Sequence, residues 1–155
     1  MVAQTSFPSE HTSASRRAFI RHPADVPIEV RTRGGATRRR ERGHDVSFGG
    51  LAFTSDQRLE PGTPVEVRIS GVEPAFEARA RVVWCGEEDG HYAVGVQFTD
   101  SGDAFRARMV EQVCSIESYR REVREREGRT LTGEEAAREW IRKYAARFPD
   151  PGRGR

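Results

Sequence analysis

Apolar and polar residues alternate in a series of short runs over the first two thirds of the chain. A period of two residues places one side of a strand against a core and the other side toward solvent. Glycine, proline and acidic residues separate the runs, and no helical pattern lies between them. The runs occupy residues 26–30, 51–53, 65–69, 78–84 and 94–98. They predict a mainly β fold, a small antiparallel barrel of about six strands, because closing the sheet removes exposed edges.

The spacing of apolar residues changes to three, four or seven after Asp103. This change predicts an amphipathic helix that has Asp103 as its N-cap and runs to about Glu127. Thr132 and Glu135 match a capping box and open a second helix, which ends at Pro149. The second helix has an apolar stripe formed by Ala137, Trp140, Ile141, Tyr144, Ala145 and Phe148. Packing against the barrel or the first helix explains this stripe, and so does docking of a partner protein.

The pattern divides the chain of 155 residues into three parts. Residues 1–15 are rich in Ser and Thr, have no periodicity and are predicted to form a disordered leader. Residues 16–127 are expected to form one domain, and residues 128–155 a C-terminal helical appendage and tail. With 35% hydrophobic and 32% charged residues, the core must be small, which favours a closed barrel over a large α/β sheet.

Composition and spacing narrow the classes of protein further. No apolar run approaches the roughly 20 residues that span a membrane, and no signal-peptide core is present, so a cytoplasmic location is expected. Cys85 and Cys114 lack the spacing of metal or redox sites, and the histidines lack ligand spacing. We therefore predict no metal and no cofactor.

Positive charge is concentrated in residues 16–42, which hold nine arginines and three acidic residues, whereas the whole chain has a net charge of +2. A local excess suits a small anion better than nucleic acid, for which the whole domain would be basic. Four of these side chains are expected in or beside the loop between the first two strands: Arg38, Arg39, Arg40 and Arg42. They form either a solvated loop or an electrostatic funnel for an anion.

The first of two short motifs is RxxxR, from Arg17 to Arg21, with Arg16 beside it. Nearby prolines favour an extended segment over a helix. Guanidinium groups stack on a base and form paired hydrogen bonds to phosphate or to a guanine edge. The alternative is a solvated basic arm.

The second motif, DxSxxG, follows after 23 intervening residues and contains Asp45, Ser47, Gly49 and Gly50. An aspartate can accept from the N1–H and amine of guanine, and a serine hydroxyl can bind phosphate or base. Glycines let backbone N–H groups approach a ligand closely. Local turn chemistry is an alternative role for Asp45 and Ser47, and a bend or bulge between strands is one for Gly50.

Taken in this order, with the strand at 94–98, the two motifs resemble the PilZ domain, a bacterial receptor for cyclic di-GMP. The resemblance covers roughly residues 15–127. It implies that Arg17 and Arg21 clamp the guanine bases and phosphates, with Arg16 in support.

The resemblance also implies that Asp45 and Ser47 lie on a strand facing the ligand. Trp84 ends an alternating run, so we expect its side chain in the barrel core or at the rim. The alternative role of Trp84 is a contact to a guanine, because some PilZ proteins use an aromatic residue near this position.

The function implied is a cyclic di-GMP receptor that is not an enzyme. His44 adjoins Asp45, but neighbours on a strand point to opposite faces, so we expect no catalytic pair. The proposed signal is an ordering of the arginine arm over the ligand, which changes the surface offered to a downstream protein partner by the barrel or the C-terminal helices. The family suggests control of motility, exopolysaccharide and biofilm. Two alternatives are an interaction adaptor without ligand and a nucleic-acid binder.

Overall fold

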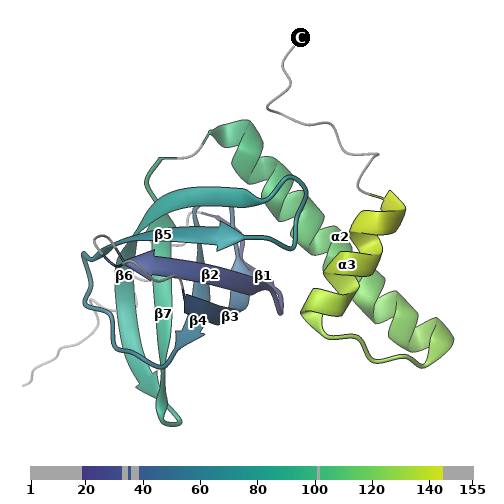
Figure 1. Cartoon of the computed structure of the whole chain (residues 1–155), viewed down its shortest axis with the longest axis horizontal. Helices are drawn as coiled ribbons and strands as arrows, with labels where there is room; N and C mark the ends of the chain where they lie inside the picture. Colours follow the sequence, from purple (N-terminus) through teal and green to yellow (C-terminus); the bar gives the residue numbers. More distant parts are fainter. Residues whose placement is uncertain (1–18, 33–34, 36–38, 101, 145–155) are drawn as a thin grey trace, which may run out of the picture.

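The computed structural model describes residues 19–32, 35, 39–100 and 102–144. Within them, seven strands precede two helices (Figure 1). The elements are β1 (His22–Pro23), β2 (Pro27–Thr32), β3 (Arg39–Val46), β4 (Gly50–Ser55), β5 (Pro64–Ile69), β6 (Phe76–Glu88), β7 (His91–Phe98), α2 (Asp103–Glu127) and α3 (Gly133–Tyr144). The leader predicted for residues 1–15 lies outside the described residues, and so do Ala145 and Phe148 of the predicted second stripe.

Six of the strands close into an antiparallel barrel in the order β2-β5-β6-β7-β4-β3. The strand β3 closes the barrel because its residues 39–42 pair with β2 and its residues 42–46 pair with β4. The two-residue strand β1 continues the edge of β3 beyond β2, opposite Asp45 and Val46. The predicted barrel of about six strands is confirmed. Arg39, Arg40 and Arg42 lie on β3 rather than in a loop, and Arg38 lies outside the described residues.

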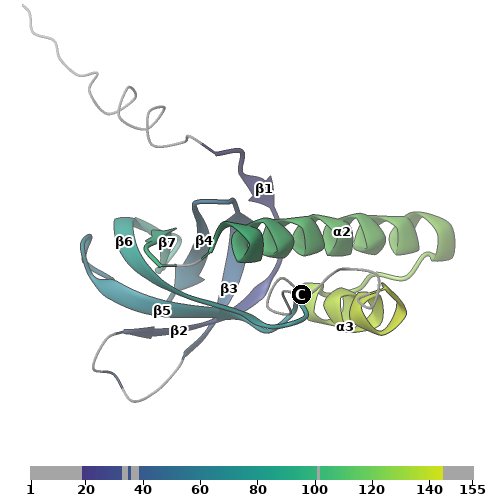
Figure 2. The same ribbon diagram turned by 90° about the horizontal axis from the view of Figure 1, so that it is seen from above.

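The core fills the barrel and continues under the helices. Phe53, Ile69, Phe76 and Val94 are fully buried inside the barrel. The helix α2 crosses one end of the barrel and extends beyond it, with α3 alongside (Figure 2). The apolar stripes of both helices join the same cluster through Met109, Val113, Ile116, Val123, Ala136, Ala137 and Trp140. Within the described residues, neither helix is long and apolar enough to cross a membrane.

The helix ends follow local chemistry. Gly102 is the N-cap of α2, and Asp103, predicted to be the cap, is the first helical residue, where its carboxylate pairs with Arg106 at 2.8 Å. Gly128 ends the helix in a left-handed conformation with φ 70°. In the predicted capping box, Glu135 accepts from the Thr132 N–H at 2.9 Å, and the Glu135 N–H donates to Thr132 Oγ1 at 3.1 Å.

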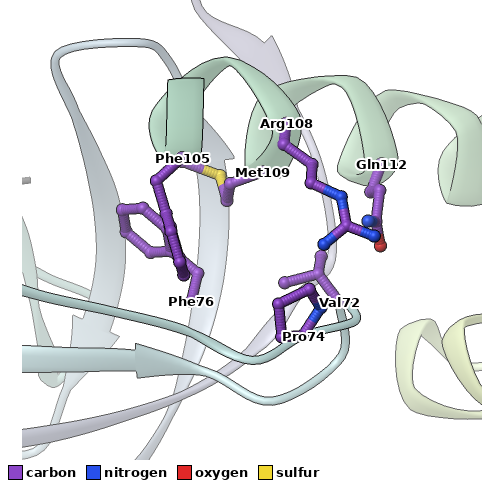
Figure 3. A pocket seen from close by; sticks show the side chains of 7 residues that line it. All are labelled: Val72, Pro74, Phe76, Phe105, Arg108, Met109 and Gln112. Carbon is purple, nitrogen blue, oxygen red and sulfur yellow. The ribbon is translucent and has the colours of Figure 1, made fainter. Parts of the chain in front are cut away.

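A buried amide attaches α2 to the loop between β5 and β6. Gln112 is 1% exposed, its Nε2 donates to the Glu73 carbonyl at 2.7 Å, and its Oε1 accepts from the Glu73 N–H at 2.9 Å. Figure 3 shows Gln112 on α2 beside Arg108, at the edge of a small pocket whose floor includes Phe76 and Val72. One side chain thus satisfies both backbone polar groups of a loop residue.

We expect Gln112→Ala to lower the free energy of unfolding by about 2 kcal/mol, because it removes two hydrogen bonds and leaves a gap. The measurement is equilibrium denaturation in urea. Glu111→Ala, at the exposed neighbouring position of α2, is the control and should change stability by less than about 0.5 kcal/mol. Equal losses in the two variants would contradict the role given to the amide.

Candidate functional site

The two motifs meet at the edge where β1 pairs with β3. His22 lies opposite Val46, and Pro23 lies opposite Asp45. This pairing places Arg21 beside the second motif. Arg21 Nε donates to Asp45 Oδ1 at 3.2 Å, and Arg21 Nη2 lies 3.2 Å from the same oxygen. Both side chains are partly exposed, at 30% and 24%, so the pair remains open to solvent.

The rest of the arm is only partly described. Arg16 and Arg17 lie outside the described residues. Phe19 packs on the β3–β4 turn, where its ring centroid lies 5.2 Å from that of Phe48. Phe19 is 45% exposed and Ile20 is 78% exposed. The arm therefore contacts the second motif through an aromatic side chain as well as through Arg21.

Ser47 organises the turn between β3 and β4. Its Oγ accepts from the N–H groups of Gly49 and Gly50, both at 3.1 Å, and donates to the Gly50 carbonyl at 3.3 Å. The Ser47 N–H also donates to the Gly50 carbonyl at 2.8 Å. Asp45 lies on β3 as expected, but Ser47 lies one residue beyond its end because it initiates this turn.

The two motif glycines allow close packing around the turn. A Cβ on Gly50 would lie 2.0 Å from the Val96 carbonyl oxygen, so the start of β4 could not approach β7 as closely. A Cβ on Gly49 would lie 2.6 Å from the Phe19 ring, so this glycine lets the arm dock on the turn. The geometry gives both positions a structural role beside any contact to a ligand.

A β-bulge turns Asp45 to the outside of the barrel. Glu41 and Gly43 point inward on β3, and the register shifts between Gly43 and Asp45, so that Val46 becomes the next inward residue. His44 is the extra residue of the bulge, and its ring contacts Thr54 on the outer face. The expectation that His44 and Asp45 lie on opposite faces is therefore wrong, because a bulge interrupts the alternation.

A second bulge, on β6, turns Trp84 to the outside of the barrel. The register of β6 against β7 shifts between Val82 and Trp84, which places Trp84 opposite Gly95. Gly95 lies between the buried Val94 and Val96 and therefore faces outward. Trp84 is thus on the outer face and half-buried, rather than in the core as strict alternation from Ala78 predicts.

Asp45 and Trp84 are consequently the two ends of one row of cross-strand neighbours on the outer face of the barrel. Asp45 lies opposite Ala52, Ala52 opposite Gly95, and Gly95 opposite Trp84. A Cβ on Gly95 would lie 2.1 Å from Trp84 Nε1, so the indole rests directly on the Gly95 backbone. Strands lie roughly 4.8 Å apart, so the row spans about 14 Å from β3 to β6. Its floor consists of the small residues Ala52 and Gly95, which are both buried, and the Trp84 indole covers Gly95.

The β3–β4 turn also contacts the first turn of α2. The Arg106 guanidinium carbon lies 4.4 Å from the centroid of the Phe48 ring, and its Nη1 donates to the Phe48 carbonyl at 3.4 Å. Phe19 lies against the same Phe48 ring. The arm, the turn and the helix are therefore joined in one chain of contacts. Phe48 was not among the predicted site residues, because it occupies an unspecified position of the DxSxxG motif.

A second link joins the segment after β1 to α2. Asp25 Oδ1 accepts from Arg42 Nε at 3.0 Å, and Asp25 Oδ2 lies 3.4 Å from Arg120 Nη2. The Asp25 N–H donates to Glu117 Oε1 at 3.1 Å. The sequence analysis also missed this cluster, because its members are up to 95 positions apart in the chain and only the fold brings them together.

Comparison with known proteins now identifies the domain. The family model described as the PilZ domain matches residues 15–113 of the chain. The chain belongs to the PilZ domain family. The matched residues include both motifs, all strands of the barrel and the beginning of α2. The domain boundaries predicted at residues 16 and 127 stay a prediction.

Several solved structures share this fold at low sequence identity. The PilZ domain with c-di-GMP of YcgR from Escherichia coli has a TM-score of 0.57 and 18% identity, with 74% of this chain and 99% of that chain covered. The inhibitor of motility MotI/DgrA from Bacillus subtilis has a TM-score of 0.56 and 14% identity, with coverage of 66% and 51%. The MrkH–c-di-GMP complex from K. pneumonia has a TM-score of 0.53 and 15% identity, with coverage of 72% and 54%.

The alignments cover different shares of the solved chains. The chain spans about half the length of the MotI/DgrA and MrkH chains. A comparison with curated proteins gave no match. The likeness to these solved structures establishes the fold of this PilZ domain.

One acidic side chain points into the barrel of this PilZ domain. Glu41 lies on β3 opposite the buried Ile28, beside Ser55, which is 2% exposed. Burial raises the pKa of the Glu41 carboxyl, although the Ser55 hydrogen bond and the charge of Arg39 partly lower it. Because its pKa is higher in the folded than in the unfolded state, stability is gained below the unfolded pKa and lost as pH rises through the folded pKa.

We therefore expect Glu41→Gln to raise the melting temperature at pH 7, where the wild-type carboxylate is ionised, and to have a smaller effect near pH 4. The measurement is thermal denaturation at both pH values. Glu66→Gln, which removes the ion-pair partner of Arg31 on the outer face, is the control and should not stabilise at either pH. A Glu41→Gln protein that is less stable than wild type at pH 7 would disprove the assignment.

Proposed function

We propose that this PilZ domain is a receptor for cyclic di-GMP, without enzymatic activity, and that it binds the dinucleotide on the outer face between Arg21 and Trp84. The observation that carries the proposal is the contact between Arg21 and Asp45, which places both motifs within reach of one ligand. Two solved structures of the same fold, the PilZ domain of YcgR and MrkH, are complexes with c-di-GMP.

Each side chain of the Arg21–Asp45 pair retains hydrogen-bonding atoms that a ligand can use. Both contacts of Arg21 use Asp45 Oδ1, so Oδ2 can accept from the N1–H and amine of a guanine. The N–H groups of Arg21 outside these contacts can donate to phosphate, and its planar face can stack on a base. By the family resemblance, Arg17 clamps the ligand from the same arm with Arg16 in support.

The turn and the indole contribute the remaining contacts. The Ser47 hydroxyl donates over 3.3 Å to the Gly50 carbonyl, the longest of its hydrogen bonds. A phosphate oxygen can therefore take this hydrogen while Ser47 Oγ still accepts from Gly49 and Gly50. The outer surface of the Trp84 indole offers a stacking platform for a guanine, because its inner surface rests on Gly95.

Binding is transmitted to the helices through the arm. The ligand orders the arginine arm, residues 16–21, over the outer face, at an entropic cost offset by charge-assisted hydrogen bonds. Phe19 contacts Phe48, and Phe48 contacts Arg106 at the start of α2. A downstream protein partner then recognises the altered surface formed by the barrel and the C-terminal helices.

We expect Asp45→Ala and Arg21→Ala each to weaken cyclic di-GMP binding by roughly 10- to 100-fold, because each loses charge-assisted hydrogen bonds worth about 1.5–3 kcal/mol. The measurement is titration calorimetry. The matched controls are Asp56→Ala, which loses a carboxylate paired with His91, and Arg58→Ala, which loses a guanidinium paired with Glu60.

Wild-type affinity in both motif variants would exclude this site. A wild-type protein that does not bind cyclic di-GMP would instead favour the interaction adaptor. Equal, strongly salt-dependent affinity for any polyanion would favour a nucleic-acid binder.

A separate variant tests transmission to α2. In the wild type, cyclic di-GMP should slow hydrogen exchange of the backbone amides in residues 103–109. Phe48→Leu removes the aromatic face under Arg106, so we expect at least half of this protection to be lost, with ligand affinity reduced less than threefold. Arg126→Ala, at the far end of α2, serves as the control. Unchanged protection in Phe48→Leu would contradict the proposed route.

A further inference from the structure

A second row of residues runs beside the first across the outer face. The Ser47 N–H donates to the Gly50 carbonyl, Gly50 lies opposite Gln97 on β7, and Gln97 lies opposite Arg81 on β6. Gly50 is two positions from Ala52, and Gln97 two from Gly95, so this row faces outward like the row from Asp45 to Trp84. Arg81 and Gln97 are both exposed. Neither belongs to RxxxR or DxSxxG.

The surroundings of Arg81 differ from those of three other arginines on β2, β5 and β6. Arg31 and Arg79 both lie opposite Glu66, and Arg68 lies opposite Glu29. The cross-strand neighbours of Arg81 are Pro64 and Gln97, which carry no charge.

Close ion pairs accompany this pattern. Arg31 is paired with Glu66, Arg68 lies 3.9 Å from Glu29, and Arg79 lies 3.5 Å from Asp100. Carboxylates therefore offset the charge of these three guanidinium groups. No carboxylate occupies a cross-strand position beside Arg81, so its positive field reaches the solvent over the row.

Charge also varies along the strands of this face. The tip of the β6–β7 hairpin carries the exposed acidic residues Glu87 and Glu88 at the end of β6 and Asp89 in the turn, beyond Trp84. Arg81 lies on the other side of Trp84. An anionic ligand stacked on the indole is repelled from the turn and attracted toward Arg81. The field therefore orients its phosphates along the row of Ser47, Gly50 and Gln97.

We propose that Arg81 and Gln97 form a second binding subsite on this face, which holds the part of a cyclic dinucleotide farthest from the arginine arm. Arg81 binds a phosphate through its guanidinium fork. The Gln97 amide, with one donor and one acceptor side, binds the edge of the adjacent guanine. This inference rests on the proposed function and deepens it, since it gives the far half of the ligand its own partners: Gln97 about 5 Å from Gly50, one strand spacing away, and Arg81 about 10 Å away, across two spacings.

The test is titration calorimetry of Arg81→Ala and Arg81→Gln with cyclic di-GMP. Both variants should bind roughly tenfold more weakly than wild type, since each loses a charge-assisted contact, and raising the salt concentration should weaken their binding less than it weakens wild-type binding. Arg79→Ala is the matched control: it removes an arginine from the same strand and face, but one that faces carboxylates. It should change affinity less than threefold.

Gln97→Ala tests the guanine contact separately. It should weaken cyclic di-GMP binding while leaving the weaker binding of cyclic di-AMP unchanged, which narrows the ratio between the two affinities. An unchanged ratio would remove Gln97 from the subsite.

The outcomes separate this inference from the proposed function. Wild-type affinity in both Arg81 variants, together with lost binding in Asp45→Ala, would overturn the second subsite and leave the receptor function standing. Equal losses in Arg81→Ala and Arg79→Ala would also overturn it, because they would reflect only the general charge of the face. No binding by the wild-type protein would overturn both.

Discussion

The pairing of two residues of β1 with the end of β3 is the constraint on which the site depends. It fixes Arg21 beside Asp45 and leads the arm over the β3–β4 turn, where Phe19 rests on Gly49. Two backbone positions thus unite motifs that are far apart in the chain. The pair is partly exposed, so its electrostatic energy in the free protein is modest. A ligand carrying phosphates and base edges can therefore compete with it or bind alongside it.

Two bulges complete the face that this pairing begins. One turns Asp45 outward on β3, and the other turns Trp84 outward on β6, with Ala52 and Gly95 between them. The barrel core tolerates both bulges because inward alternation resumes soon after each one, at Val46 on β3 and at Cys85 on β6, opposite the buried Val94. The same closed core that stabilises the protein therefore supports a row of small residues on its outside, between Asp45 and Trp84.

Much of the fold followed from local pattern, because alternation, capping and helix spacing depend on neighbours in the chain. The barrel and the capping box at Thr132 and Glu135 were predicted in this way and are confirmed. The outward position of Trp84 was not predicted in this way, because a bulge reverses the inward and outward alternation of a strand without a sequence signal. The contact of Phe48 with Arg106 also depends on tertiary packing, which no local pattern encodes.

The central claim is that the arm and the β3–β4 turn hold the same molecule. The most direct measurement is an amide chemical-shift map of the 15N-labelled protein during titration with cyclic di-GMP. The account predicts that the largest changes occur together at Arg21, Asp45 and Gly50, with the indole N–H of Trp84 moving at the same ligand concentrations. Changes confined to one of the two segments, or centred on the opposite side of the barrel around Glu66, would contradict it.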